Sequence, residues 1–261
     1  MVKIISIHSS RGGTGKSLIS SNIAAILASE GRNVAIIDFD FRAPSLLTIF
    51  QAKGMPRKYV NSYLEGKSKI QEIMVDLTNK WKTKGKLYVG FANPDMEAMR
   101  EIARKDRRWQ MNALKRVTAM KSVLADEFKV DIIIIDTSPG VQYSSVNAVV
   151  SSDVSLIVSS LDQLDIEGVQ RIITDLYDPF EKNTYVLVNK ARPYMFISEE
   201  SKKKLLEETR QVFSKPLIAI IPCYCDILLA QRVSIFYLDN PEHQFSWALR
   251  EVALRLEQLT V

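Results

Sequence analysis

The chain has 261 residues, of which 46% are hydrophobic and 25% are charged, with a net charge of +5, so it can bury a sizeable globular core. No apolar run reaches the ~20 residues that a membrane-spanning helix needs, and the N-terminal segment lacks the cleavage pattern of a signal peptide. We therefore expect a cytoplasmic protein, and its only two cysteines, Cys223 and Cys225, are too close in sequence to form a disulfide framework.

The first predicted elements are a strand over residues 2–8 and a helix over 17–31, joined by the glycine-rich segment SSRGGTGKSL. Glycines let successive backbone N–H groups curve around a phosphate. Lys16 can reach the β- and γ-phosphates, and the Ser17 hydroxyl can bind Mg²⁺. The strict pattern G-x-x-x-x-G-K-[ST] has glycine where this chain has Ser10, but its ending is intact. A simple turn would not need the lysine, so we predict a phosphate-binding loop.

Acidic residues end two of the next strands. The strand over 33–40 ends in Asp38 and Asp40, which point the same way because side chains alternate along a strand. The strand over 130–136 ends in Asp136. These strands are almost continuously apolar, which is typical of a parallel sheet covered on both faces. Asp136 can therefore orient Mg²⁺ beside the phosphate loop, and the other two can serve the metal or the attacking water. Without the phosphate loop, a solvated strand end would be the better explanation of Asp38 and Asp40.

Residues 51–125 interrupt the alternation of strands and helices and carry 17 Lys and Arg against 7 Asp and Glu. We expect one strand, over 86–92, and three helical pieces, one of which opens near Pro94. Another carries a predicted apolar stripe of Trp109, Ala113, Val117, Met120 and Leu124. If the helix is continuous, one face also holds Arg100, Arg104, Arg108 and Lys115. This face is either a contact surface for an acidic partner such as DNA or a solvated helix face.

The remaining expected strands cover residues 153–160, 184–190 and 216–222, and the last helix covers 245–259. Its apolar face is Leu249, Val252, Leu256 and Leu259, which we expect to pack on the sheet rather than to dock on a membrane. The pattern predicts an α/β fold: a doubly wound, mostly parallel sheet with helices on both faces. We expect a single domain over residues 1–261, with 51–125 as a basic, largely helical elaboration.

These motifs together resemble those of the deviant-Walker P-loop ATPases of the MinD/ParA family. The resemblance rests on Arg11 to Ser17, on Asp38-Phe39-Asp40, and on Asp136-Thr137-Ser138-Pro139-Gly140. In addition, Asn189 resembles the asparagine of the family that contacts the base, and Pro222 resembles part of the loop that packs on adenine.

The resemblance implies that ATP and Mg²⁺ bind at the strand ends and that two ATP-loaded copies close face to face. Hydrolysis would be slow and stimulated by a regulatory or cargo protein. The nucleotide would be held by Gly12, Gly13, Thr14, Gly15, Lys16, Ser17 and Leu18. Ser17 would bind the metal directly, Asp136 would act through metal-bound water, and Asp40 would position the attacking water near the metal.

Two further roles are implied around the phosphates. The Gly140 N–H would sense the γ-phosphate. Arg11 replaces the signature lysine of the family and either crosses to the phosphates of the partner subunit, or only neutralises the nucleotide of its own subunit or pairs with a nearby carboxylate. The replacement of the usual residues by Thr137 and Ser138 is expected to preserve the turn.

We expect the ATPase to position or partition a cargo such as a chromosome, a plasmid, or division or motility machinery. An alternative is a metal-cluster carrier of the Mrp type, but such carriers have a C-x-x-C pair soon after the asparagine strand. Here Cys223 and Cys225 form C-x-C after the following strand. A bacterial-type tyrosine kinase shares the Asp-x-Asp-x-Arg pattern but ends in a tyrosine cluster that this sequence lacks.

Overall fold

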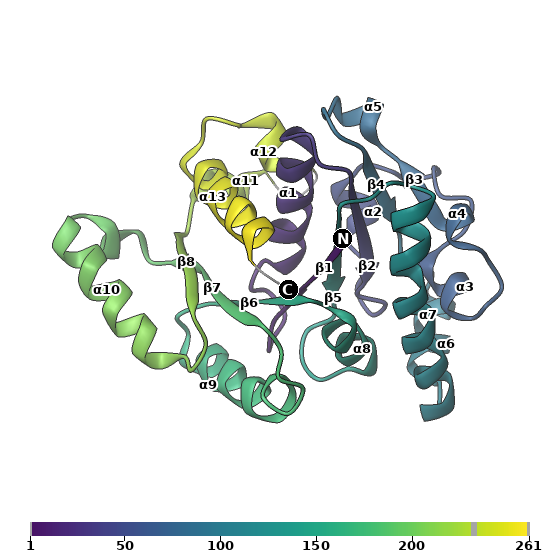
Figure 1. Ribbon diagram of the computed structural model, residues 1–261. Coiled ribbons are helices and arrows are strands. Elements are labelled where there is room, and N and C mark those ends of the chain that lie inside the picture. The colour runs from purple at the N-terminus through teal and green to yellow at the C-terminus, as the bar shows by residue number, and fades with distance from the viewer. Residues whose placement is uncertain (1, 231–233, 260–261) are drawn as a thin grey trace.

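The computed structural model describes residues 2–230 and 234–259, and these form one eight-stranded sheet in the order β3-β4-β2-β5-β1-β6-β7-β8 (Figure 1). All neighbouring strands pair in parallel except β3, which runs antiparallel to β4 at one edge. The strands are β1 (Lys3–His8), β2 (Val34–Phe39), β3 (Met74–Asp76), β4 (Leu87–Gly90), β5 (Ile132–Thr137), β6 (Val154–Ser159), β7 (Thr184–Ala191) and β8 (Leu217–Pro222).

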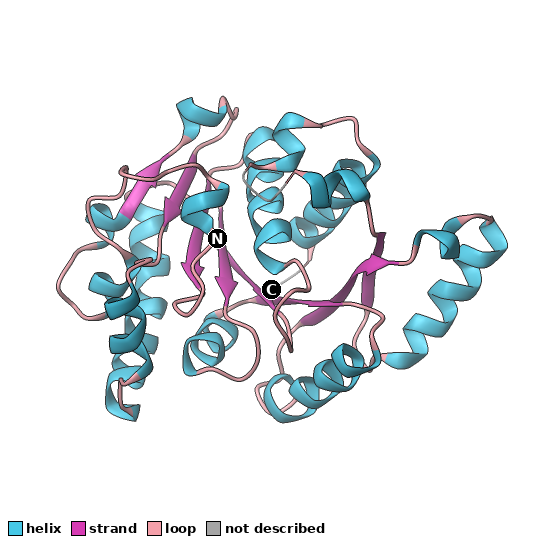
Figure 2. Ribbon diagram, turned by 180° about the vertical axis from the view of Figure 1, so that it is seen from behind, coloured by secondary structure: helices cyan, strands magenta, loops and turns pink. Residues whose placement is uncertain are grey.

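Helices cover both faces of the sheet, as the apolar strands require (Figures 1 and 2). One face packs against α1 (Lys16–Ser29), α2 (Leu46–Ile49), α5 (Thr78–Trp81), α11 (Cys225–Leu229), α12 (Phe236–Asp239) and α13 (Gln244–Gln258). The other packs against α3 (Val60–Leu64), α4 (Ile70–Ile73), α6 (Met96–Ala103), α7 (Arg107–Asp126), α8 (Tyr143–Ser151), α9 (Gln163–Ile172) and the π-helix η1 (Ile173–Tyr177). Beyond β8 lie the short η2 (Pro193–Phe196) and α10 (Glu199–Val212), which extends outward (Figure 2). The predicted doubly wound fold is confirmed.

The strands β1, β2, β5 and β6 place the phosphate loop at the centre of the sheet. Every residue of β2, β5 and β6 is buried, which explains their unbroken apolar sequences. Helix α1 is buried around most of its surface because it lies between the sheet and α13. It is followed by Gly31 in the left-handed region, with φ of 95°. The expected strand–loop–helix context of the phosphate loop is therefore present.

The basic region contains a break between two of its predicted helical pieces. Helix α6 ends at Ala103, and α7 begins anew because the Asp106 side chain caps it by accepting a hydrogen bond from the Trp109 N–H (2.8 Å). Arg100 therefore lies on α6, whereas Arg108 and Lys115 lie on α7, so the condition of a continuous helix is not met and the four cations do not share one helix face. The region also contains the strand β3, which was not predicted.

The predicted apolar faces of the two long helices are confirmed. In α7 the stripe Ala113, Val117, Met120 and Leu124 is buried and Trp109 is half-buried. In α13 Leu249, Val252 and Leu256 are buried against the sheet, with Leu259 half-buried beside them. Among the described helices, none combines the length and apolar character that crossing a membrane requires.

Candidate nucleotide-binding site

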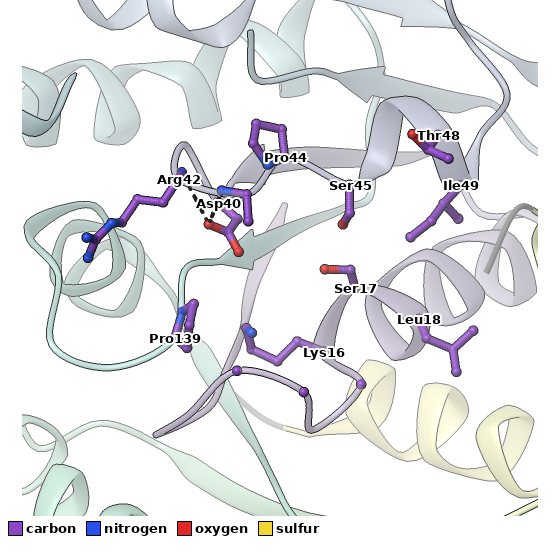
Figure 3. A pocket seen from close by; sticks show the side chains of 14 residues that line it. Lys16, Ser17, Leu18, Asp40, Arg42, Pro44, Ser45, Thr48, Ile49 and Pro139 are labelled. Atoms are coloured by element: carbon purple, nitrogen blue, oxygen red, sulfur yellow. Dashed lines mark hydrogen bonds between the residues drawn. The ribbon is translucent and has the colours of Figure 1, made fainter. Parts of the chain in front are cut away.

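A cavity of about 540 Å³ lies where the parallel strands β1, β2 and β5 end (Figure 3). Its walls are the phosphate loop (residues 9–18), the segment after β2, and Pro139 after β5. The lining residues include Gly12, Gly13, Gly15, Lys16, Ser17, Leu18, Asp40, Arg42 and Ser45. Figure 3 shows the side chains of Lys16 and Ser17 pointing into the space between the phosphate loop and the segment after β2.

Two glycines give the phosphate loop its shape. Gly13 and Gly15 have φ values of 90° and 98°, in the left-handed region that side chains with a Cβ rarely adopt. A Cβ at Gly15 would also lie only 2.5 Å from Nδ2 of Asn189. This amide instead donates a hydrogen bond to the Thr14 carbonyl (2.8 Å). Asn189 therefore supports the loop from behind, through a contact that no sequence pattern predicts.

The loop accommodates Ser10 because a glycine stands opposite it. A Cβ at Gly168, in the middle of α9, would lie 2.8 Å from both Cβ and Oγ of Ser10. The Ser10 hydroxyl donates to the Asp165 carbonyl at 3.3 Å. The loop therefore has a serine where the strict motif has glycine. The space for the serine side chain exists because α9 carries a glycine, Gly168, at the point of contact. Sequence reasoning missed Gly168, for which the only signal was a single glycine within a helical pattern.

Asp38 and Asp136 are paired neighbours on β2 and β5, and both are completely buried. Burial raises the pKa of Asp136 to about 6, against the opposing effect of the nearby Lys16 charge. Burial, followed by the charges of Asp136 and Asp40, raises the pKa of Asp38 well above its usual value. The Asp38 carboxylate accepts hydrogen bonds from the N–H groups of Asp40 (2.9 Å) and Leu46 (3.3 Å), so it shapes the segment after β2.

One carboxylate oxygen of Asp40 accepts hydrogen bonds from neighbouring groups, and the other faces the cavity. Its Oδ1 accepts from the Ser138 hydroxyl (3.0 Å) and from the N–H groups of Ala43 (3.2 Å) and Arg42 (3.3 Å). Figure 3 shows the second oxygen turned toward the space beside Lys16. The three donors fix the orientation of the carboxylate, so the free oxygen is held in place to accept a proton or orient a water. The contribution of Ser138 was not foreseen.

The described residues fit a magnesium ion that is shared with bound phosphates. Neither oxygen of Asp136 has a partner at hydrogen-bond distance among these residues, although the Ser17 and Ser20 hydroxyls lie near enough to lower its pKa, so the buried carboxylate can still accept a cation. The Ser17 hydroxyl lines the same cavity. No cluster of three or more His, Cys, Asp or Glu in the described ranges could hold a metal alone. Mg²⁺ commonly keeps water and phosphate ligands beside one or two protein groups, and Ser17 and Asp136 are two groups of the kind it binds.

Three other predicted site residues, Arg11, Gly140 and Pro222, lie outside the cavity lining, as does Lys190, which follows Asn189. Arg11 is about half exposed and reaches toward Asp162 at the start of α9, with 3.9 Å between Nη1 and Oδ1. Lys190 donates from Nζ to the Gly13 carbonyl (2.6 Å), and Gly140 donates its N–H to the Ser9 carbonyl (2.9 Å). Pro222 ends β8 beside the end of β7 and does not line the cavity.

Comparison with known proteins identifies the family. A family model described as an AAA domain matches residues 2–186, which is more than half of the chain. This chain belongs to the MinD/ParA family of P-loop ATPases. Septum site-determining protein MinD of Thermotoga maritima is 26% identical to it over 262 residues, covering 98% of this chain and 88% of that protein.

Solved structures of MinD/ParA proteins share the fold along nearly the whole chain. MinD of Pyrococcus horikoshii, complexed with Mg-ADP, gives a TM-score of 0.76 at 21% identity, covering 99% of this chain and 97% of the other. MinD in the MinC:MinD complex of Aquifex aeolicus gives 0.78 at 22%, covering 100% and 97%. A putative plasmid partition protein of Borrelia burgdorferi, bound to AMPPNP, gives 0.73 at 20%, covering 99% and 100%. The family resemblance drawn from the motifs is confirmed.

Proposed function

We propose that this protein is an ATP-binding and ATP-hydrolysing switch that requires Mg²⁺. The observation that carries the proposal is the convergence of Lys16, Ser17 and the buried carboxylate of Asp136 beside one glycine-shaped loop. The loop N–H groups and the N-terminus of α1 favour an anion there. Lys16 supplies positive charge for the β- and γ-phosphates. The ADP bound to MinD and the AMPPNP bound to the partition protein support this choice of ligand.

Each residue has a distinct part in the proposed reaction. Ser17 and Asp136 would hold Mg²⁺, which supplies charge neutralisation of the phosphates when it is bound. Lys16 orients the terminal phosphate and stabilises the negative charge that grows on the leaving group. Asp40 orients the attacking water through its free oxygen, while Ser138 holds the other oxygen. Hydrolysis by this set is expected to be slow until a partner protein completes it.

We infer that ATP brings two copies together through the sheet edge that carries the site. Large exposed apolar side chains follow the carboxyl ends of several parallel strands: Val141 and Tyr143 after β5, Leu164 after β6, and Tyr194 and Ile197 after β7. Clustered apolar exposure is typical of an interaction surface. Arg11 lies at the same edge in a long, exposed ion pair, which contributes little in water and is easily exchanged.

We propose that the switch positions or partitions a cargo, as the names of its division and plasmid-partition relatives suggest. The exposed cations of α6 and α7, including Arg100, Arg108 and Lys115, are the surface that would contact DNA, and such binding would weaken steeply with salt. The carrier alternative is not favoured, because Cys225 is exposed at the start of α11 and the named relatives are MinD and partition proteins.

Calorimetry with Lys16→Ala tests the nucleotide assignment. Losing a charge-assisted contact to phosphate should weaken binding of Mg-ATP by about tenfold or more. The matched control is Lys203→Ala, which removes an exposed lysine of α10 and should leave the affinity unchanged. Equal Mg-ATP affinity for wild type and Lys16→Ala would show that the cavity is not the nucleotide site.

A further inference from the structure

A buried chain of hydrogen bonds runs behind the phosphate loop from η1 to the loop after β5. His8 is the last residue of β1 and is completely buried, as is Tyr177 of η1. The imidazole Nδ1 lies 2.7 Å from the Tyr177 hydroxyl, and Nε2 lies 3.0 Å from the Gly140 carbonyl oxygen. Gly140 in turn donates its N–H to the Ser9 carbonyl (2.9 Å). The chain thus joins η1, β1 and the Gly140 loop (residues 138–142).

The partners determine which nitrogen of His8 carries the proton. A carbonyl oxygen can only accept, so Nε2–H donates to Gly140 and Nδ1 accepts from the Tyr177 hydroxyl. Burial, assisted by the Lys16 charge and opposed by the Gly140 bond, lowers the pKa of His8 to about 4. Burial also raises the pKa of Tyr177 well above its usual value. At neutral pH the proton on Nε2 of His8 and the proton on the Tyr177 hydroxyl are therefore both available for these hydrogen bonds.

These contacts hold the Gly140 backbone on both sides. Gly140 has φ of 71°, follows the cavity residue Pro139, and precedes the exposed residues Val141 and Tyr143. Its N–H is occupied by Ser9, so it would have to leave that carbonyl before it could contact a γ-phosphate. Its carbonyl accepts separately from His8 and from the Gln142 N–H (3.0 Å), so His8 supplies the contact that reaches it from outside the loop. The imidazole can therefore serve as a fixed pivot while the N–H changes partner.

We propose that His8 and Tyr177 are positioning residues that hold the Gly140 carbonyl and thereby set the preference of the loop for ATP over ADP. This inference rests on the proposed function, in which the Gly140 N–H senses the γ-phosphate. Held at its carbonyl, the loop loses little conformational freedom when the N–H moves to phosphate. When the contact with His8 is lost, the loop must instead be ordered by the bound nucleotide. This ordering costs free energy only when the Gly140 N–H contacts a γ-phosphate, so it weakens the binding of ATP and not of ADP. The π-helical turn of η1 places Tyr177 for this contact, consistent with the frequent use of such turns at functional sites.

The test compares affinities for ADP and for AMPPNP, an ATP analogue, by calorimetry in the presence of Mg²⁺. Tyr177→Phe keeps the ring and removes only the hydroxyl that orients His8. We expect about fivefold weaker AMPPNP binding, the effect of losing one buried hydrogen bond, with unchanged ADP binding. Amide hydrogen exchange over residues 140–143 should become faster. His8→Leu should show the same selective loss, whereas His8→Gln, whose amide can both accept from Tyr177 and donate to Gly140, should restore the wild-type ratio.

The matched control is Ser6→Ala. Ser6 lies on the same face of β1 as His8, and its buried hydroxyl is hydrogen-bonded to Ser155 (2.8 Å) and Ser152 (3.1 Å) rather than to the Gly140 loop. This variant should leave the ratio of the two affinities unchanged. If wild type binds both nucleotides and the ratio of AMPPNP affinity to ADP affinity is unchanged in Tyr177→Phe and His8→Leu, this inference is wrong but the proposed function still stands. If wild type bound neither nucleotide, the proposed function itself would be wrong. Should His8→Leu not fold, Tyr177→Phe and His8→Gln still decide the matter.

Discussion

At the scale of single residues, Asp38 and Asp40 show how two carboxylates two positions apart acquire different tasks. Asp38 is completely buried, and its two carboxylate oxygens accept hydrogen bonds from the backbone N–H groups of Asp40 and Leu46. Asp40 lines the cavity and keeps one oxygen free of the donors that fix the other. Of these two carboxylates, only Asp40 is therefore placed to orient a water beside the proposed phosphate site.

Asp40→Asn should separate hydrolysis from binding. The amide oxygen can still accept from Ser138, so the local structure is kept, but the negative charge that orients the water is lost. We expect turnover of ATP to fall by about 100-fold or more, as for other positioned acid–base groups, while ATP affinity changes little. Steady-state phosphate release and calorimetry measure the two effects. Asp38→Asn is the matched control and should change turnover far less; undiminished turnover in Asp40→Asn would move the role to another residue.

Asp136 is placed for function at the expense of stability. Its folded pKa of about 6 is above the usual carboxyl value, so between about pH 4 and pH 6 the folded state binds more protons than the unfolded state. Stability of the nucleotide-free protein from this group is therefore greatest below that window and declines as pH rises through it. Asp136→Asn removes the buried charge and should stabilise the nucleotide-free protein by roughly 2 kcal/mol at pH 7.

Urea unfolding at pH 7 and at pH 4.5 measures this difference between wild type and Asp136→Asn. The gain should shrink at the lower pH, where the wild-type carboxyl is protonated, and Mg-ATP should stabilise only the wild type appreciably. A variant that is less stable than wild type at pH 7 would show that the carboxylate is already satisfied in the nucleotide-free protein.

Residues that form one contiguous motif were predictable, whereas those that act across the fold were not. Lys16 and Ser17 are recognisable from their neighbours in sequence, and Asp136 from its place at the end of an apolar strand. The support of Asp40 by Ser138 depends on the pairing of β2 with β5. The contact of Asn189 with Thr14 spans 175 residues. No local pattern encodes either of these contacts, because each depends on how distant segments meet.

At the scale of secondary-structure elements, α9 shapes the phosphate loop through Gly168. In an ordinary helix interior, replacing glycine by alanine stabilises the protein by about 1 kcal/mol. Here the added methyl group would lie 2.8 Å from the Ser10 side chain, so we expect Gly168→Ala to destabilise the fold by about 1–2 kcal/mol through overpacking. Urea unfolding measures the sign directly.

The double variant Ser10→Gly with Gly168→Ala supplies the control for this contact. Removing the Ser10 side chain relieves the clash, so the double variant should recover most of the lost stability. A strong non-additive coupling is expected for two groups in direct contact. If Gly168→Ala stabilised the protein as in an isolated helix, α9 would not be packed closely on the loop.

Element types were predictable where apolar periodicity was strong, but the exact position of the break between α6 and α7 was not. All seven predicted strands form, because each is a short apolar run buried in the sheet. The basic stretch from Arg100 to Lys115 has helical character throughout, so its pattern continues across the break. The break arises from the Asp106 cap, a local backbone contact that competes with helix continuation. The three-residue β3 is too short for periodicity to detect.

At the scale of the whole molecule, parallel strand order brings the phosphate loop and exposed apolar residues to one edge. The loops after β5, β6 and β7 all emerge there, because their strands run in the same direction as β1. Each of these loops carries at least one exposed apolar side chain, such as Tyr143, Leu164 or Ile197. A partner copy docked on this edge would cover these side chains and the bound nucleotide together. This arrangement makes ATP-dependent pairing the expected output of the site.

The role of Arg11 decides whether the nucleotide is shared between two copies. In a single chain its guanidinium faces Asp162 across 3.9 Å in an exposed pair, so little free energy holds it there. A planar guanidinium can offer two parallel hydrogen bonds to phosphate oxygens of a partner's nucleotide. Arg11→Ala should therefore leave ATP binding by the monomer nearly unchanged and weaken ATP-induced dimers by about tenfold or more, the loss expected for a charged hydrogen bond.

Sedimentation of the ATP-bound protein over a range of concentrations measures this loss, and Asp162→Asn provides the opposing control. Asparagine can still cap α9 through the Leu164 N–H, which now donates to Asp162 at 3.0 Å, but it no longer attracts Arg11. Releasing the guanidinium should leave ATP-induced dimers as strong as in wild type or stronger. If Arg11→Ala dimerises with wild-type strength, Arg11 does not cross between subunits, and the cross-subunit role does not apply to this residue.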